Sequence, residues 1–169
     1  MIIEKAIKTA IEYEIQVRDV YMENAKKFRD PVARKIFKVL ADEEQDHVDY
    51  LEKRLEEWQK TGKVTLKKLK TAIPAKKDID AGVKKLKKRA RQQDFADELE
   101  IFKKALSMEI EASNFYKKMV SELPPEDKPL FERFVEIEVG HETIVQAEID
   151  SVTGLGFWFD FMEFDLEAG

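Results

Sequence analysis

The chain has two histidines, and each stands three residues after a glutamate, as Glu44-x-x-His47 and Glu138-x-x-His141. Residues at positions i and i+3 lie on one face of a helix, so each pair can present a carboxylate and an imidazole to a single site. A donor set that is rich in hard oxygen atoms and poor in nitrogen suits iron or manganese better than copper. The first chemistry that the sequence indicates is therefore metal binding.

Four segments carry apolar residues at helical spacings of three and four, and a glutamate interrupts each series near its middle. A carboxylate that faces a hydrophobic core costs several kcal/mol unless it is neutralised. No lysine or arginine shares these faces beside the glutamates, whereas two divalent cations would balance four carboxylates. The sequence therefore predicts a two-metal site whose ligands are Glu14, Glu44, His47, Glu109, Glu138 and His141.

The two halves of the chain match each other around these glutamates. Glu14 and Tyr21 are seven residues apart, as are Glu109 and Tyr116. Each half thus supplies one glutamate, one tyrosine and one Glu-x-x-His pair. We expect both tyrosines to point at the site and to hydrogen-bond a ligating carboxylate, with a radical or proton-relay role as the alternative.

The helical periodicity and the positions of glycine and proline predict an all-α chain without a sheet. Two short turns make two antiparallel hairpins, and one long connection must cover the length of the bundle. The prediction is a single domain, residues 1–169, with a short aromatic C-terminal segment. The helices are expected at about 3–28, 31–60, 94–123 and 126–152, with a crossover at 61–93 and a tail at 154–169. Whether residues 80–93 form a separate helix or extend the third helix stays open.

The composition excludes several classes of protein. The absence of cysteine rules out disulfides, thiolate zinc sites, iron–sulfur clusters and a rubredoxin-type iron module. No apolar run approaches the roughly 20 residues that a membrane helix needs. The N-terminal residues carry acids early and lack the layout of a signal peptide, so we expect a cytoplasmic protein with no membrane contact.

The six predicted ligands resemble those of the ferritin-like di-iron carboxylate proteins, specifically the rubrerythrin family, over roughly residues 3–152. The resemblance implies a ferritin-like four-helix bundle and two iron ions per chain, with manganese or adventitious zinc as alternatives. It also implies that Glu44 and Glu138 bridge the two ions and that the other ligands are terminal. Proteins of this kind are commonly dimers, so a homodimer is expected, and the long crossover would allow exchange of hairpins between subunits.

The chain departs from rubrerythrins in two respects. It has no rubredoxin module. Ala112 stands where rubrerythrins carry an additional glutamate, three residues after the ligand of the third expected helix, Glu109. The counterpart of this position in the first helix is Val17. In that family the additional glutamate is tied to movement of iron during peroxide turnover, so its absence resembles the simpler six-ligand site of bacterioferritins.

The function that these residues and the resemblance predict is a di-iron oxidoreductase. It would reduce hydrogen peroxide or dioxygen while oxidising Fe²⁺, in defence against oxidative stress, with an electron donor that the sequence does not identify. The first alternative is a ferroxidase that handles iron for storage, as ferritins do. The second is a bundle-shaped interaction module without catalysis.

The crossover and the tail have unusual compositions. Residues 60–91 hold 13 basic residues and two acids in a chain with a net charge of −5. This segment has no aromatic side chain on which bases could stack, so we expect a solvated crossover and no nucleic-acid partner. The tail is expected to be buried against a bundle end or a partner subunit, and its apolar residues are Phe157, Trp158, Phe159, Phe161, Met162, Phe164 and Leu166.

Further acids near the predicted ligands are weaker candidates. Glu148 follows His141 by two helical turns near a helix end, so we expect it to be solvated, with a proton or iron route as the alternative. The remaining acids fall off the apolar faces and are expected on the surface; they are Glu12, Glu43, Asp46, Glu111 and Glu142.

Overall fold

The computed structural model describes residues 2–86, 95–155 and 158–161, and within them all regular structure is helical. The helices are α1 (Ile2–Ala25), α2 (Pro31–Thr61), α3 (Lys76–Leu86), α4 (Ala96–Glu122) and α5 (Lys128–Leu155). The prediction of an all-α chain is therefore confirmed. Among the described helices, none combines the length and the apolar character that crossing a membrane would require.

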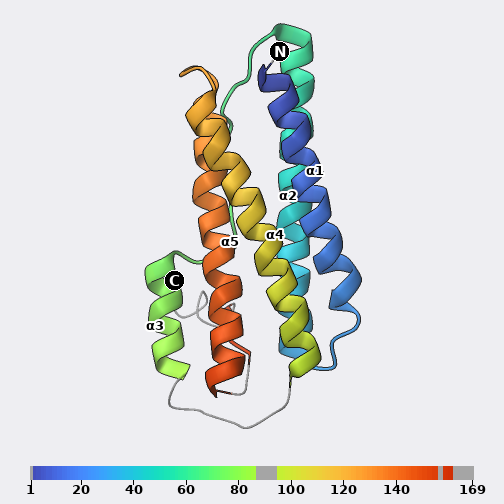
Figure 1. Ribbon diagram of the computed structural model, residues 1–169, viewed down its shortest axis with the longest axis vertical. Coiled ribbons are helices and arrows are strands. Elements are labelled where there is room, and N and C mark those ends of the chain that lie inside the picture. The colour runs from blue at the N-terminus through green and yellow to red at the C-terminus, as the bar shows by residue number, and fades with distance from the viewer. Residues whose placement is uncertain (1, 87–94, 156–157, 162–169) are drawn as a thin grey trace.

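Four long helices lie along the long axis of the molecule, and α1 packs against both α2 and α4 (Figure 1). In Figure 1, α1 and α5 run in one direction, while α2 and α4 run in the other. The chain must therefore cross the full length of the bundle between α2 and α4, as the sequence predicts. This arrangement is compatible with a ferritin-like bundle. The question of whether the connection contains a separate helix is answered for Lys76–Leu86, which form α3 and pack beside α5.

The helix ends follow from local chemistry. Asp30 caps α2 by accepting hydrogen bonds from the backbone N–H groups of Val32 at 2.8 Å and Ala33 at 3.1 Å. Gly62 ends the same helix in the left-handed conformation at φ 68°, which glycine adopts without steric cost. Leu123 ends α4 with an extended backbone, because the proline after it disfavours the helical conformation.

Within the described residues, the hydrophobic core consists of two clusters, one toward each end of the bundle. One cluster surrounds Tyr21, where the rings of Phe37 and Phe102 meet edge to face at 4.4 Å between centroids. The other surrounds Tyr116, whose ring stacks on Phe134 at 4.9 Å. The polar side chains that interrupt the apolar faces of the helices therefore lie between the two clusters.

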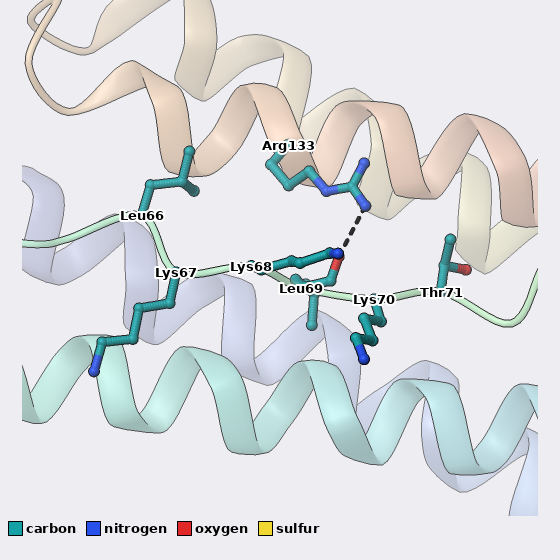
Figure 2. A pocket seen from close by; sticks show the side chains of 7 residues that line it. All are labelled: Leu66, Lys67, Lys68, Leu69, Lys70, Thr71 and Arg133. Carbon is teal, nitrogen blue, oxygen red and sulfur yellow. Dashed lines mark hydrogen bonds between the residues drawn. The ribbon is translucent and has the colours of Figure 1, made fainter.

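The crossover between α2 and α3, residues 62–75, is an extended strap that is anchored through its backbone. The carbonyl oxygens of Thr65, Lys67 and Leu69 accept hydrogen bonds from Arg54, Tyr50 and Arg133 at 2.9, 2.6 and 2.8 Å, respectively. Figure 2 shows the contact between Arg133 of α5 and the strap, beside a pocket of about 640 Å³. These contacts hold the strap against both α2 and α5.

The side chains of the strap divide between the core and solvent. Leu69 and Ile73 are buried, whereas Lys67, Lys68 and Lys70 are exposed. The prediction of a crossover with solvated lysines is therefore confirmed for this segment. The anchoring of the strap could not be predicted from the sequence, because a hydrogen bond to a backbone carbonyl does not depend on the identity of the residue that accepts it.

Part of the aromatic tail packs into the core. Trp158 stacks on Phe102 at 4.4 Å between centroids, and Phe159 and Phe161 are also buried. The prediction of burial against the bundle is confirmed for these residues. The other apolar residues assigned to the tail, Phe157, Met162, Phe164 and Leu166, lie outside the described residues.

We predict that Gly82→Ala destabilises the protein, although alanine favours a helix over glycine by about 1 kcal/mol. A Cβ atom at Gly82 would lie 2.7 Å from Cζ of the buried Phe159, and overpacking of this kind costs about 1–3 kcal/mol. Thermal unfolding monitored by circular dichroism measures the effect. Gly140→Ala is the control, because its Cβ would meet Ile73 at an ordinary 3.9 Å, so its Tm should rise. Equal Tm increases for both variants would contradict the close packing of α3 on Phe159.

Candidate metal centre

The six predicted ligand side chains meet in one buried layer between the two apolar clusters. The four long helices all contribute, and no member of the set exposes more than 1% of its surface. The contributions are Glu14 from α1, Glu44 and His47 from α2, Glu109 from α4, and Glu138 and His141 from α5. Side chains that are up to 127 residues apart in the chain thus form one cluster, from Glu14 to His141.

The cluster contains two overlapping groups of potential ligands whose donor atoms lie within 4.8 Å of one another. One group is Glu14, Glu44, His47 and Glu138; the other is Glu44, Glu109 and His141. Glu44 belongs to both groups, a position that suits the bridging role expected from the resemblance. Glu138 belongs to one of them, so its bridging role stays a prediction.

Both histidines direct the same ring nitrogen toward the carboxylates. Nδ1 of His47 lies 3.0 Å from Glu14 and 3.3 Å from Glu44. Nδ1 of His141 lies 2.7 Å from Glu44 and 3.5 Å from Glu109. The two rings stack at 5.2 Å between centroids with an angle of 22° between their planes. The common orientation leaves Nδ1 as the nitrogen that could hold a metal.

Several polar atoms of the layer have no hydrogen-bond partner in the described part of the protein. They include both carboxylate oxygens of Glu44, one oxygen each of Glu109 and Glu138, and Nδ1 of His141. Buried polar atoms are normally satisfied, so each such atom needs an explanation. Metal coordination would use these oxygen and nitrogen atoms, so the residues present fit a metal site.

Burial and mutual repulsion spread the pKa values of the carboxylates apart. Burial raises the pKa of Glu44 to about 8, and the charges of Glu14 and Glu109 add to this increase. Burial also acts to raise the pKa of Glu14, but its interactions with the Glu44 carboxyl group and with His47 outweigh burial and lower the value to about 2. The pKa of Glu138 rises because of burial and the neighbouring charges. Without a cation, the layer therefore cannot keep all its carboxylates ionised at neutral pH.

The histidines respond to the same negative charge. Burial acts to lower the pKa of His47, but the charge of Glu44 and the hydrogen bond to Glu14 raise it to about 10. For His141, burial opposes a rise in pKa that the charges of Glu44 and Glu109 produce. Protons on the imidazoles thus replace part of the positive charge that a metal would supply.

The two tyrosines connect the hairpins through the carboxylates. The hydroxyl of Tyr21, on α1, donates to Glu109 on α4, and the hydroxyl of Tyr116, on α4, donates to Glu14 on α1. Burial and the nearby carboxylate charges raise the pKa of both tyrosines well above the ordinary value, so the hydroxyls keep their protons. The expected hydrogen bonds are present, and each tyrosine bonds to the glutamate of the other hairpin.

The prediction that Glu43 lies on the surface is wrong. The residue is 5% exposed, and its carboxylate accepts hydrogen bonds from the Thr71 hydroxyl at 2.6 Å and the Ala72 N–H at 3.2 Å. The strap covers this side of α2, and no spacing within α2 itself reveals that cover. Of the other off-face acids, Glu12, Asp46 and Glu111 are exposed as predicted, and Glu142 is half-buried.

The prediction that Glu148 is solvated is also wrong. The residue is fully buried, and one carboxylate oxygen accepts the backbone N–H of Phe159 at 2.9 Å. Burial raises its pKa well above the ordinary value, and the charge of Asp160 adds to the effect. Glu148 lies on the apolar face of its helix, and this position was a sign of burial in the sequence. The segment that covers it, which includes Phe159, follows the helix and has no periodicity from which its position could be predicted.

Comparison with protein families gave one match that covers nearly the whole chain. A family model described as Rubrerythrin matches residues 5–149, a span that includes all six predicted ligands and both tyrosines. Searches of curated proteins and of solved structures gave no significant match.

We predict that metal binding to the cluster releases protons at pH 7. His47, with a pKa of about 10, and Glu44, with a pKa of about 8, hold protons in the metal-free protein that a cation must displace. Affinity for a divalent metal should therefore increase from pH 6 to pH 8. Isothermal titration calorimetry in two buffers of different ionisation enthalpy counts the released protons. Equal heats in both buffers would contradict the prediction that His47 and Glu44 hold protons in the metal-free protein.

We predict that Glu148→Gln stabilises the metal-free protein above pH 4.5. Because the folded-state pKa of Glu148 is raised, its favourable contribution is complete below its ordinary value of 4.5 and is lost as pH rises through the folded value. Glutamine carries no charge and keeps an oxygen that can accept the Phe159 N–H. The Tm of the variant minus that of the wild type should therefore increase from pH 4.5 to pH 8. The exposed Glu132 on the same helix provides the control variant, Glu132→Gln, whose Tm difference should stay flat.

Proposed function

The chain belongs to the rubrerythrin family, and on this basis we propose that it is a di-iron oxidoreductase that reduces hydrogen peroxide or dioxygen. The observation that carries the proposal is the buried layer of four glutamates and two histidines with unsatisfied oxygen and nitrogen atoms. Structural carboxylate clusters normally pair with lysine or arginine, whereas in the described part of the chain the basic side chains beside this one are the two histidines. A pair of divalent cations answers both the excess of negative charge and the unsatisfied atoms.

The six side chains would hold two iron ions, since Glu44 belongs to both groups of donor atoms and each group contains one histidine. When bound, Fe²⁺ ions supply the two electrons that reduce peroxide or dioxygen. Reduction of one peroxide to two waters also consumes two protons. The apolar clusters on either side of the layer exclude bulk water, so reactants must reach a dry site.

The tyrosines support this chemistry by holding carboxylates. Tyr21 and Tyr116 each donate a hydrogen bond to a terminal glutamate, which leaves the other oxygen of that glutamate for a metal. Because their pKa values are raised, they act as hydrogen-bond donors and do not carry negative charge in the resting site. We infer a positioning role for both.

The surroundings of the cluster favour a site with six ligands. Ala112 and Val17, at the positions related to the additional rubrerythrin glutamate, are both buried apolar side chains. Neither can follow a metal ion that changes its position. We therefore do not propose for this chain the iron movement that accompanies peroxide turnover in rubrerythrins.

We also propose that an external electron donor returns the oxidised site to its ferrous state, since a cysteine-free chain cannot contain a rubredoxin-type module. All six candidate ligands come from one chain, so exchange of hairpins is not needed to complete the site. A homodimer stays a prediction.

Rapid mixing of the Fe²⁺-loaded protein with H₂O₂ and, separately, with O₂ tests the proposal. We expect oxidation of two irons per chain, seen as a rise in near-ultraviolet absorbance, and its loss in Glu44→Ala. Glu111→Ala is the matched control, because Glu111 is an exposed glutamate on α4. Circular dichroism of both variants reports whether the bundle remains folded.

The outcomes separate the candidate functions. Faster oxidation by peroxide that stops at two irons per chain supports a peroxidase, and faster oxidation by O₂ at the same stoichiometry supports a dioxygen-reducing enzyme. Continued uptake beyond two irons per chain would instead identify a ferroxidase that serves storage. Absence of oxidation with both oxidants would contradict the oxidoreductase proposal and favour an interaction module.

A further inference from the structure

Glu43 occupies a position beside the histidines that the proposed ligand set leaves unexplained. Its Oε1 atom is 3.8 Å from Nε2 of His141, the ring nitrogen opposite the Nδ1 atom that faces Glu44 and Glu109. A carboxylate oxygen of Glu43 and one ring nitrogen from each histidine also lie within 4.8 Å of one another. One carboxylate thus faces both rings.

The strap fixes the position of this carboxylate. The Thr71 hydroxyl donates to Oε1 at 2.6 Å, and the Ala72 N–H donates to Oε2 at 3.2 Å. The Thr71 hydroxyl also accepts the Ile73 N–H at 3.1 Å, and the Ile73 side chain is buried. A charged group held by hydrogen bonds from a neighbouring segment cannot turn away to solvent without breaking them.

The chemistry of imidazole explains what a carboxylate at the position of Glu43 would do. A neutral imidazole has one N–H, and a nitrogen that binds a metal must be the one without the proton. Nδ1 of each histidine faces the ligand carboxylates, so the proton belongs on Nε2. Neither Nε2 atom has a hydrogen-bond partner among the described residues, and the Glu43 carboxylate lies near both rings, 3.8 Å from Nε2 of His141.

The second hairpin has no equivalent group. The residue before Glu44 is Glu43, whereas the residue before Glu138 is the buried Ile137. The stacked arrangement of the two rings, 5.2 Å apart, allows one carboxylate to serve both. The strap that holds Glu43 passes on this side of the bundle, which accounts for the asymmetry.

We propose that Glu43 is a positioning residue that holds His47 and His141 in the tautomer with the proton on Nε2, leaving both Nδ1 atoms free to bind metal. This inference rests on the metal site of the proposed function but not on its redox chemistry. Loss of a group that orients a ligating histidine typically weakens metal binding by about 10–100-fold. Thr71 supports the effect by orienting Glu43.

Binding of Zn²⁺ to the full chain, in competition with a chelator, tests the proposal without any redox step. We expect Glu43→Gln to bind Zn²⁺ about 10-fold or more weakly, because it keeps the shape but loses the charge that attracts the N–H. Thr71→Val should weaken binding in the same direction by a smaller factor. Asp46→Asn is the matched control, because Asp46 precedes His47 directly but is exposed.

Nitrogen-15 NMR of the Zn²⁺-loaded protein supplies a readout that a merely structural role would not change. With two histidines in the chain, four ring-nitrogen signals report both tautomers. In the wild type both Nε2 atoms should carry a slowly exchanging proton, and in Glu43→Gln these protons should shift upfield and exchange faster. Unchanged Nε2 signals with unchanged affinity would overturn the proposal.

Two further outcomes distinguish a failure of the positioning role of Glu43 from a failure of the proposed metal site. If Glu44→Ala binds two Zn²⁺ ions as tightly as the wild type, the proposed ligand set itself fails, and the positioning role fails with it. If the wild type binds a third Zn²⁺ ion that Glu43→Gln loses, Glu43 is a ligand of a separate site and the positioning role is wrong. Weaker Zn²⁺ binding by Glu43→Gln supports the inference even if no oxidant reacts with the iron-loaded protein.

Discussion

The burial of four carboxylates and two imidazoles in one layer is the constraint on which the rest of the structure depends. Ionised carboxylates in a dry interior are stable only beside compensating positive charge. Each long helix therefore has to bring its polar residue to the same height as the others, while the apolar residues above and below form separate clusters. The spread of pKa values, from about 2 for Glu14 to about 8 for Glu44, is the response of the metal-free layer to this crowding.

The tyrosines turn two similar hairpins into one unit. If Tyr21 and Tyr116 bonded glutamates of their own helices, each hairpin would be complete in itself. Instead, each hydroxyl donates to the glutamate of the opposite hairpin, so the carboxylate orientation in one hairpin depends on the packing of the other. The rings also pack into the two apolar clusters, which couples the order of the polar layer to the order of the core.

The symmetry between the halves ends where the connecting segments begin. Seven residues after its histidine, the first hairpin has the buried Arg54, which donates to the strap, and the second has the buried Glu148, which accepts from the C-terminal segment. Both side chains anchor the segment that follows their own helix, Arg54 as a hydrogen-bond donor and Glu148 as an acceptor. The strap then reaches Glu43, so the segment that joins the hairpins also contacts the group beside both histidines.

The sequence alone determined the helices, their order and the six candidate ligands, because helical periodicity is local and a glutamate or histidine that interrupts it is visible in one dimension. It also predicted the direction of Tyr21 and Tyr116 toward the site. Only the tertiary structure decided which glutamate each tyrosine bonds, and that Glu43 and Glu148 are buried. These outcomes depend on the strap and the C-terminal segment, which lack helical periodicity, and their contacts run largely through backbone groups that every residue carries.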